Sequence, residues 1–260
     1  MSVFAIGDLH LSFDERIEKP MDIFGDSWLD HHERLKEYWT ESVSADDTVM
    51  IPGDVSWGLR LDEALADFKW IHELPGKKII TKGNHDLWWT SITRLNDLFD
   101  DIIFLQNHCY MVPDTKIAVC GTRGWICPGT VDFDEHDQKI FDRELLRLNF
   151  SLEEAKRQGA EEIIAALHYP PTNDKMQVSG FTEMLSRYGV KTCVYGHLHG
   201  AGIVLHKKVG DKVTKGESLA TLYSGNKKKM AEALKIAEKA FEITKEKPDK
   251  PVLIKDVIKE

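Results

Sequence analysis

The chain has 260 residues, 42% of them hydrophobic, which is enough to bury the core of one large α/β domain or of a domain with an appendage. A formal net charge of −9 disfavours long nucleic acids, whose non-specific binding depends on cationic side chains. The N-terminus lacks a basic segment followed by an apolar run, and no apolar segment is long enough to cross a bilayer, so we expect a soluble, cytoplasmic protein without membrane partners.

Short apolar segments rich in β-branched residues recur along the chain, and each ends at a polar or glycine-containing stretch. Their brevity and composition predict buried strands at 3–6, 48–51, 78–81, 102–105, 116–120, 163–167 and 192–195. Apolar residues at mixed three- and four-residue spacing predict helices within the segments 27–43, 60–73, 89–99, 134–158 and 179–188. This alternation is typical of a layered α/β fold.

The composition changes near residue 201, where glycine and lysine become frequent and the predicted strands are short. We therefore expect a catalytic domain at 1–200 and a C-terminal segment at 201–260 that contains a β-hairpin and a lysine-rich helix. The hairpin is expected from the runs "GIVLH" and "SLATLY", and we expect it to pack against the second sheet of the domain.

Polar clusters follow five of the predicted strands: "GDLH", "GDVSWG", "GNHD", "LHYPP" and "GHLHG". Ligand sites in α/β sheets form outside the carboxyl ends of strands, so these clusters can converge on one crevice. Together they supply Asp8, His10, Asp54, Asn84, His85, His168, His197 and His199. Carboxylates and imidazoles without cysteine suit Mn²⁺, Fe²⁺ or Zn²⁺, and the set is large enough for two ions that share a carboxylate.

These five motifs, in this order, resemble the calcineurin-like metallophosphoesterases, whose pattern is D-x-H, G-D, G-N-H-D/E, H and G-H-x-H. The resemblance covers residues 1 to about 200 and implies a layered β-sandwich flanked by helices. It also implies a first metal bound by Asp8, His10 and His199, and a second bound by Asn84, His168 and His197, with Asp54 as the bridge. By the same resemblance, His85 is a proton donor or transition-state partner that Asp86 orients.

The function implied by the resemblance is hydrolysis of a phosphoester, with a metal-bridging hydroxide as the nucleophile. Arg123, between two glycines after a predicted strand, could bind a substrate phosphate, although a loop arginine paired with a carboxylate is an equal alternative. The alternative functions are a nuclease or cyclic-nucleotide phosphodiesterase of the same fold, and a non-catalytic metal-binding scaffold. The presence of His85 favours catalysis.

Two further features bear on the substrate and on the tail. Protein Ser/Thr phosphatases have an Asp-Arg pair shortly after the bridging aspartate, whereas this chain has "GDVSWGLR", so we expect a phosphorylated small molecule as the substrate. The segment "GIVLHKKVGDKVTKGESLATLYS" resembles the end of the C-terminal domain of pyrimidine nucleoside phosphorylases. The nucleoside- and phosphate-binding segments of those enzymes are missing, so the resemblance implies no phosphorylase activity.

Overall fold

The protein is described from a computed structural model of the whole chain, and the description covers residues 1–19, 21, 28–198, 202–205, 212–217, 219–223, 234–235, 237, 241 and 243–244. The chain divides into two compact units, Met1–His197 and Leu198–Glu260. Within the described residues, no helix is long and apolar enough to cross a membrane.

The first sheet of the larger unit contains four parallel strands in the order β1-β2-β3-β4, namely β1 (Val3–Ala5), β2 (Thr48–Pro52), β3 (Lys77–Thr81) and β4 (Ile102–Leu105). Every residue of β2 is buried, as expected for a central strand that is covered on both faces. Because the strands are parallel, their carboxyl ends lie along the same edge of the sheet.

The second sheet has the order β5-β6-β7-β8, with β5 (Tyr110–Met111), β6 (Ile117–Thr122), β7 (Glu162–Leu167) and β8 (Thr192–Tyr195). The last three strands are parallel, and β5 pairs antiparallel to β6. The sequence pattern did not predict β5, because two residues are too few to show a periodicity. All the other strands of the two sheets were predicted, and the α/β fold class is confirmed.

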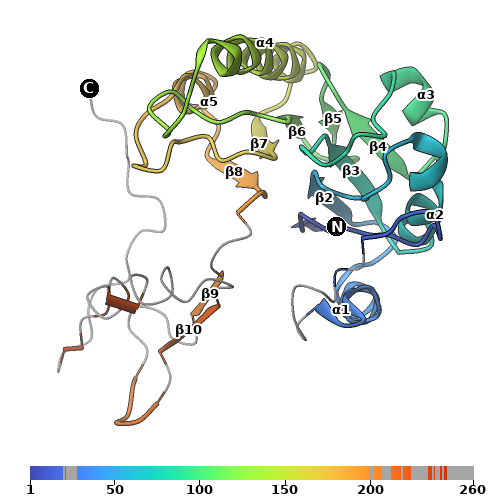
Figure 1. Cartoon of the computed structure of the whole chain (residues 1–260). Helices are drawn as coiled ribbons and strands as arrows, with labels where there is room; N and C mark the ends of the chain where they lie inside the picture. Colours follow the sequence, from blue (N-terminus) through green and yellow to red (C-terminus); the bar gives the residue numbers. More distant parts are fainter. Residues whose placement is uncertain are drawn as a thin grey trace. The chain divides into compact units, whose positions relative to one another are not determined.

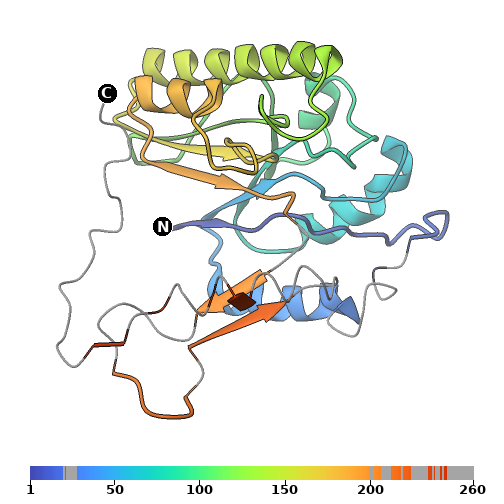
Figure 2. The same cartoon turned by 60° about the vertical axis from the view of Figure 1, so that its left-hand side comes forward.

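The two sheets pack against each other, and helices cover their outer faces (Figure 1). The first sheet is covered by α1 (His31–Ser42), α2 (Leu61–His72) and α3 (Ile92–Asn96). The second is covered by α4 (Glu135–Arg157) and α5 (Gly180–Arg187), which lie side by side in Figure 2. The predicted helical segments are therefore present, with α3 much shorter than the segment predicted for it.

Side-chain alternation along the strands separates three hydrophobic clusters. On β2, Val49 and Ile51 face the helices of the first sheet, whereas Met50 lies in the layer between the two sheets. That middle layer also contains Ile79, Leu105, Val112, Val119 and Ala166. Large apolar contacts on both sides of each sheet fix the strands, so the loops at their carboxyl ends start from rigid positions.

The smaller unit contains a hairpin of β9 (Gly202–Leu205) and β10 (Ala220–Tyr223). The two strands pair antiparallel, with Gly202 opposite Tyr223, so the predicted partners do pair with each other. The expected packing of this hairpin against the second sheet stays a prediction. Most of the predicted lysine-rich helix lies outside the described residues.

Candidate metal centre

The predicted ligands occupy the loops that follow β1, β2, β3, β7 and β8. The loops after β1 and β2 run together, since Asp8 N–H donates to Gly53 O at 3.1 Å and His10 N–H donates to Asp54 O at 3.0 Å. His199 lies outside the described residues, so its predicted role as a ligand stays a prediction.

Four of the predicted ligands have left-handed backbone conformations, with φ of 56° at Asp8, 47° at His10, 51° at Asp54 and 71° at His197. Residues with a Cβ visit this region rarely, although aspartate and histidine do so more often than most. Such conformations cost free energy and persist where the surrounding structure enforces them, which happens often at functional sites.

Glycines of the motifs allow these loops to approach one another closely. A Cβ added at Gly83 would lie 2.8 Å from Asp54 Cγ, and still closer to two other atoms of Asp54. An added Cβ at Gly196 would likewise overlap the carboxylate of Asp8. The glycine in "GNHD" and the first glycine in "GHLHG" are therefore needed because neighbouring ligand loops occupy the space of a side chain.

The first group of predicted ligands consists of Asp8, His10 and Asp54. Each offers a ligand atom, and these atoms lie within 4.8 Å of one another. His10 Nε2 is 3.9 Å from Asp8 Oδ1. His10 and Asp54 are almost completely buried, with 1% and 0% of their surfaces exposed. Two carboxylates and an imidazole in this largely buried group match the ligand types of Mn²⁺, Fe²⁺ and Zn²⁺.

The second group converges on the side-chain oxygen of Asn84. His168 Nε2 lies 2.7 Å and His197 Nδ1 lies 2.8 Å from Asn84 Oδ1. The other ring nitrogen of His168 lies 2.9 Å from Pro52 O, so Nδ1 carries the proton and Nε2 presents a lone pair. Lone pairs on an imidazole and on an amide oxygen that face the same point suit a bound cation.

Asp54 belongs to both groups. Its Oδ2 lies 3.4 Å from His168 Nε2, while the same carboxylate contributes to the group with Asp8 and His10. Its Oδ1 accepts the backbone N–H of His85 at 2.8 Å. The His85 ring lies 4.5 Å from the Trp57 ring and 5.9 Å from the His10 ring, measured between centroids. The structure therefore brings the described ligands and His85 together.

Residues 1–201 match the family model described as calcineurin-like phosphoesterase. The chain belongs to the calcineurin-like phosphoesterase family. Members of this family are phosphohydrolases that depend on divalent metal ions. Residues 197–244 match the model of the pyrimidine nucleoside phosphorylase C-terminal domain.

Individual relatives of this phosphoesterase are distant. The gene 66 protein of Mycobacterium phage L5 is 35% identical over 79 residues, which make up 30% of this chain and 37% of the phage protein. The chain thus matches little more than a third of that relative's length. A protein of unknown function from Aquifex aeolicus, AQ665, is 15% identical with a TM-score of 0.37, covering 75% of this chain and 89% of the other. The phosphopantetheinyl hydrolase PptH from Mycobacterium tuberculosis is 15% identical with a TM-score of 0.48, covering 78% and 85%.

Asp86 organises this phosphoesterase site through the backbone, a role that its place in the motif did not reveal. Its buried carboxylate accepts N–H groups from Gly83 at 2.6 Å and from Asp54 and Val55 at 2.9 Å. Burial raises the pKa of Asp86 to about 6, although these hydrogen bonds favour the ionised form. The carboxylate thereby ties the loop after β2 to the loop after β3. Orientation of His85 by Asp86 stays a prediction.

A second buried carboxylate, Asp67 of α2, supports the same loop from the helix side. It accepts the hydroxyl of Ser56 and the backbone N–H of Phe13, the latter at 2.8 Å. Burial raises the pKa of Asp67 to about 6. The loop that carries Asp54 is therefore held by one carboxylate on each side.

Two aromatic residues at the site were not predicted to contact the ligands. Trp57 stacks on His10, with centroids 4.7 Å apart and planes 20° apart. Tyr169 lies 4.1 Å from His197 between ring centroids. The sequence could have indicated these contacts through proximity to the motifs, because Trp57 comes three residues after Asp54 and Tyr169 directly follows His168. Rings in these places restrict the orientation of the imidazoles.

Arg123 lies beside the second group of ligands. Its carbonyl oxygen accepts the N–H groups of His168 at 3.0 Å and Tyr169 at 2.9 Å. Its guanidinium pairs with buried Glu144 at 3.4 Å and lies over the Trp125 ring at 4.4 Å from the centroid. The carboxylate pairing considered from the sequence is thus present, and substrate binding by Arg123 stays a prediction.

Proposed function

We propose that the domain at residues 1–200 hydrolyses phosphoesters at a centre of two divalent metal ions. Family membership supports metal-dependent hydrolysis of a phosphoester. The observation that carries the two-ion proposal is the position of Asp54, whose carboxylate lies 3.4 Å from His168 and also within the group formed with Asp8 and His10. A carboxylate shared between two ligand groups can bridge two ions, and pairs of ions about 3.5–4 Å apart are used by phosphatases and nucleases.

The two proposed ligand sets use residues on both sides of Asp54. Asp8, His10 and His199 would hold one ion, and Asn84, His168 and His197 would hold the other. The donor types suit Mn²⁺, Fe²⁺ or Zn²⁺. When bound, two such ions lower the pKa of a coordinated water and neutralise charge on phosphoryl oxygens.

The chain's own residues then have separate tasks in the proposed reaction. His168 is fixed in one tautomer by its contact with Pro52 O at 2.9 Å, which keeps Nε2 directed toward Asn84. His85, which is partly exposed beside Asp54, would donate a proton to the leaving oxygen. Arg123 would bind a phosphate group of the substrate, which we propose to be a phosphorylated small molecule in the cytoplasm.

Elemental analysis combined with hydrolysis assays tests this function. We expect close to two transition-metal ions per chain and loss of activity after treatment with a chelator. A parallel screen of phosphomonoester and phosphodiester model substrates separates a phosphatase from a phosphodiesterase or nuclease. Full activity of a metal-free preparation contradicts the proposal, and a metal-loaded protein that hydrolyses none of the substrates supports the scaffold alternative.

A further inference from the structure

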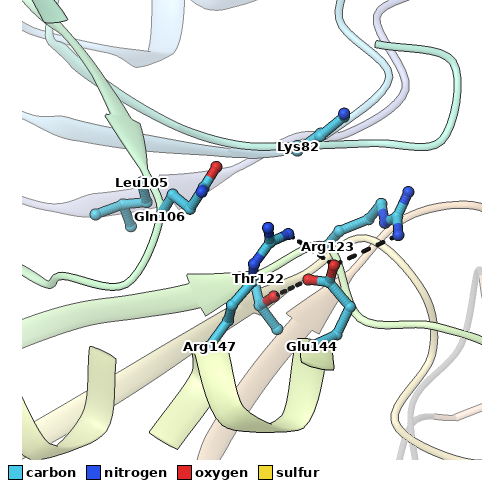
Figure 3. Close-up of a pocket in the computed structure, with 7 residues that line it drawn as sticks. All are labelled: Lys82, Leu105, Gln106, Thr122, Arg123, Glu144 and Arg147. Carbon is cyan, nitrogen blue, oxygen red and sulfur yellow. Dashed lines mark hydrogen bonds and ion pairs between the residues drawn. The ribbon is translucent and has the colours of Figure 1, made fainter. Parts of the chain in front are cut away.

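A second cluster of charged side chains lies around a small hollow next to the candidate metal centre (Figure 3). Its cations come from three different elements: Lys82 follows β3, Arg123 follows β6, and Arg147 lies on α4. Gln106, which follows β4, also lines the hollow. The hollow therefore opens at the same ends of the strands that carry the predicted metal ligands.

The cluster has more positive charge than its own carboxylate neutralises. Glu144 is fully buried and accepts hydrogen bonds from Thr122 Oγ1, from Arg147 Nη1 at 2.8 Å and from Arg123 Nη2 at 3.4 Å. One arginine is enough to balance this carboxylate. With Lys82 included, the lining carries three cations and one anion, an excess of two positive charges.

Two donors in this lining remain unused within the described part of the chain. Arg123 Nε is buried and has no hydrogen-bond partner there. Lys82 is half-buried and makes no hydrogen bond or ion pair with the described residues. A buried donor without an acceptor is unfavourable unless a ligand or water satisfies it. Because Trp125 holds the guanidinium of Arg123 from one face, that donor is already oriented before any ligand binds.

The charge and position of the hollow indicate the class of anion. It is a small hollow that is partly open to solvent. A phosphate group is compact, and arginine binds its oxygens with two parallel hydrogen bonds. Lys82 is two residues before Asn84, and the Arg123 carbonyl bonds to the N–H of His168, so the cluster directly adjoins the metal centre.

We propose that Lys82, Arg123 and Arg147 form a second anion site that binds a phosphate group of the substrate other than the one that is cleaved. The substrate class is then a small phosphoester with a second phosphate group. This inference rests on the proposed function, because the cleaved phosphate occupies the metal centre.

Kinetics with matched substrates test the second site. Full-length, metal-loaded protein is assayed with glucose 6-phosphate and glucose 1,6-bisphosphate, which differ by one phosphate group. We expect a higher kcat/KM for the bisphosphate. Arg147→Gln should reduce the ratio of the two kcat/KM values by a factor of about 10 to 100, the effect of losing a hydrogen bond to a charged group. Arg147→Lys keeps the charge and should restore part of the ratio.

The matched control is Arg157→Gln, which removes the same charge from the same helix at an exposed position. It should keep the wild-type ratio. Thermal unfolding and metal analysis of each variant separate a folding defect from a binding defect. An equal ratio in the wild type and in Arg147→Gln overturns the second anion site.

Direct binding distinguishes failure of this inference from failure of the proposed function. Calorimetric titration of the metal-loaded protein with glucose 1,6-bisphosphate and with inorganic phosphate is compared between the wild type and Arg147→Gln. If the protein has no hydrolytic activity but binds the bisphosphate, and this binding depends on Arg147, the proposed function is refuted and the second anion site is supported. Hydrolysis without such binding refutes the site. If inorganic phosphate binds as tightly as the bisphosphate, and also through Arg147, the site takes free phosphate and the substrate class is wrong.

Discussion

Substitution of Gly83 by alanine should disrupt the candidate metal centre through crowding alone. The added Cβ would lie 2.8 Å from Asp54 Cγ, whereas ordinary van der Waals contact begins near 3.4 Å, so the two loops must separate by at least about 0.6 Å. Rotation of the Asp54 side chain cannot relieve this overlap, because the added Cβ also meets the backbone nitrogen of Asp54. That nitrogen is held in place by its hydrogen bond to Asp86 at 2.9 Å. The separation also strains the bond from Gly83 N–H to the same carboxylate, at 2.6 Å.

The expected cost follows from these two effects. Overpacking in a rigid region costs about 1–3 kcal/mol, and a weakened hydrogen bond to a charged group costs up to about 3 kcal/mol. We therefore expect Gly83→Ala to lower the free energy of unfolding by about 1–6 kcal/mol and to reduce metal content. Displacement of a ligand by a fraction of an ångström should also lower kcat of the residual metal-loaded protein. Denaturant unfolding, elemental analysis and hydrolysis assays measure the three quantities.

Gly159→Ala is the matched control for this substitution. Gly159 has φ of 83° and no atom within 4 Å of an added Cβ, so its replacement introduces backbone strain without crowding. It should cost about 1–2 kcal/mol and leave metal content unchanged. If Gly83→Ala is as stable as this control and binds metal normally, the close approach of the two loops does not position Asp54, and the reasoning fails.

Three further predictions address chemistry, pH dependence and the tail. His85→Ala should retain metal and lower kcat by a factor of about 10² to 10⁴, with the largest loss for substrates that have poor leaving groups. Asp54→Ala should lose metal. Equal metal loss in both variants would mean that His85 is a ligand. Burial raises the pKa of Asp67 in the folded protein from 3.8 to about 6. Protonated Asp67 therefore contributes its full stabilisation of the fold below about pH 4. This contribution, about 3 kcal/mol, is lost as the pH rises through 6. Asp67→Asn should therefore flatten the dependence of unfolding free energy on pH between 4 and 7, and an unchanged slope would contradict the raised pKa. Truncation after Ser224 should preserve metal content because every proposed ligand precedes it, and a metal-free truncated protein would refute this.

The sequence by itself determined where the strands lie along the chain and predicted the chemistry of the site. Short β-branched segments identified the strands, since burial on both faces requires continuous apolar residues in β2 and its neighbours. The motifs after those strands predicted Asp8, Asp54 and His168 as neighbours, because parallel strands place their carboxyl ends at one edge. These signals are local in sequence, and they do not depend on how the helices pack.

The tertiary structure alone decided which residues support those ligands. Asp86 adjoins His85 in sequence, yet its hydrogen bonds bind the backbone of another loop. Arg147 belongs to an ordinary charged helix by its sequence, and only the packing of α4 on the second sheet brings it to the hollow that Lys82 lines. Contacts of this kind join segments that are far apart in the chain. Helical periodicity in the sequence specifies which face of α4 is buried, but it does not specify which loop that face contacts.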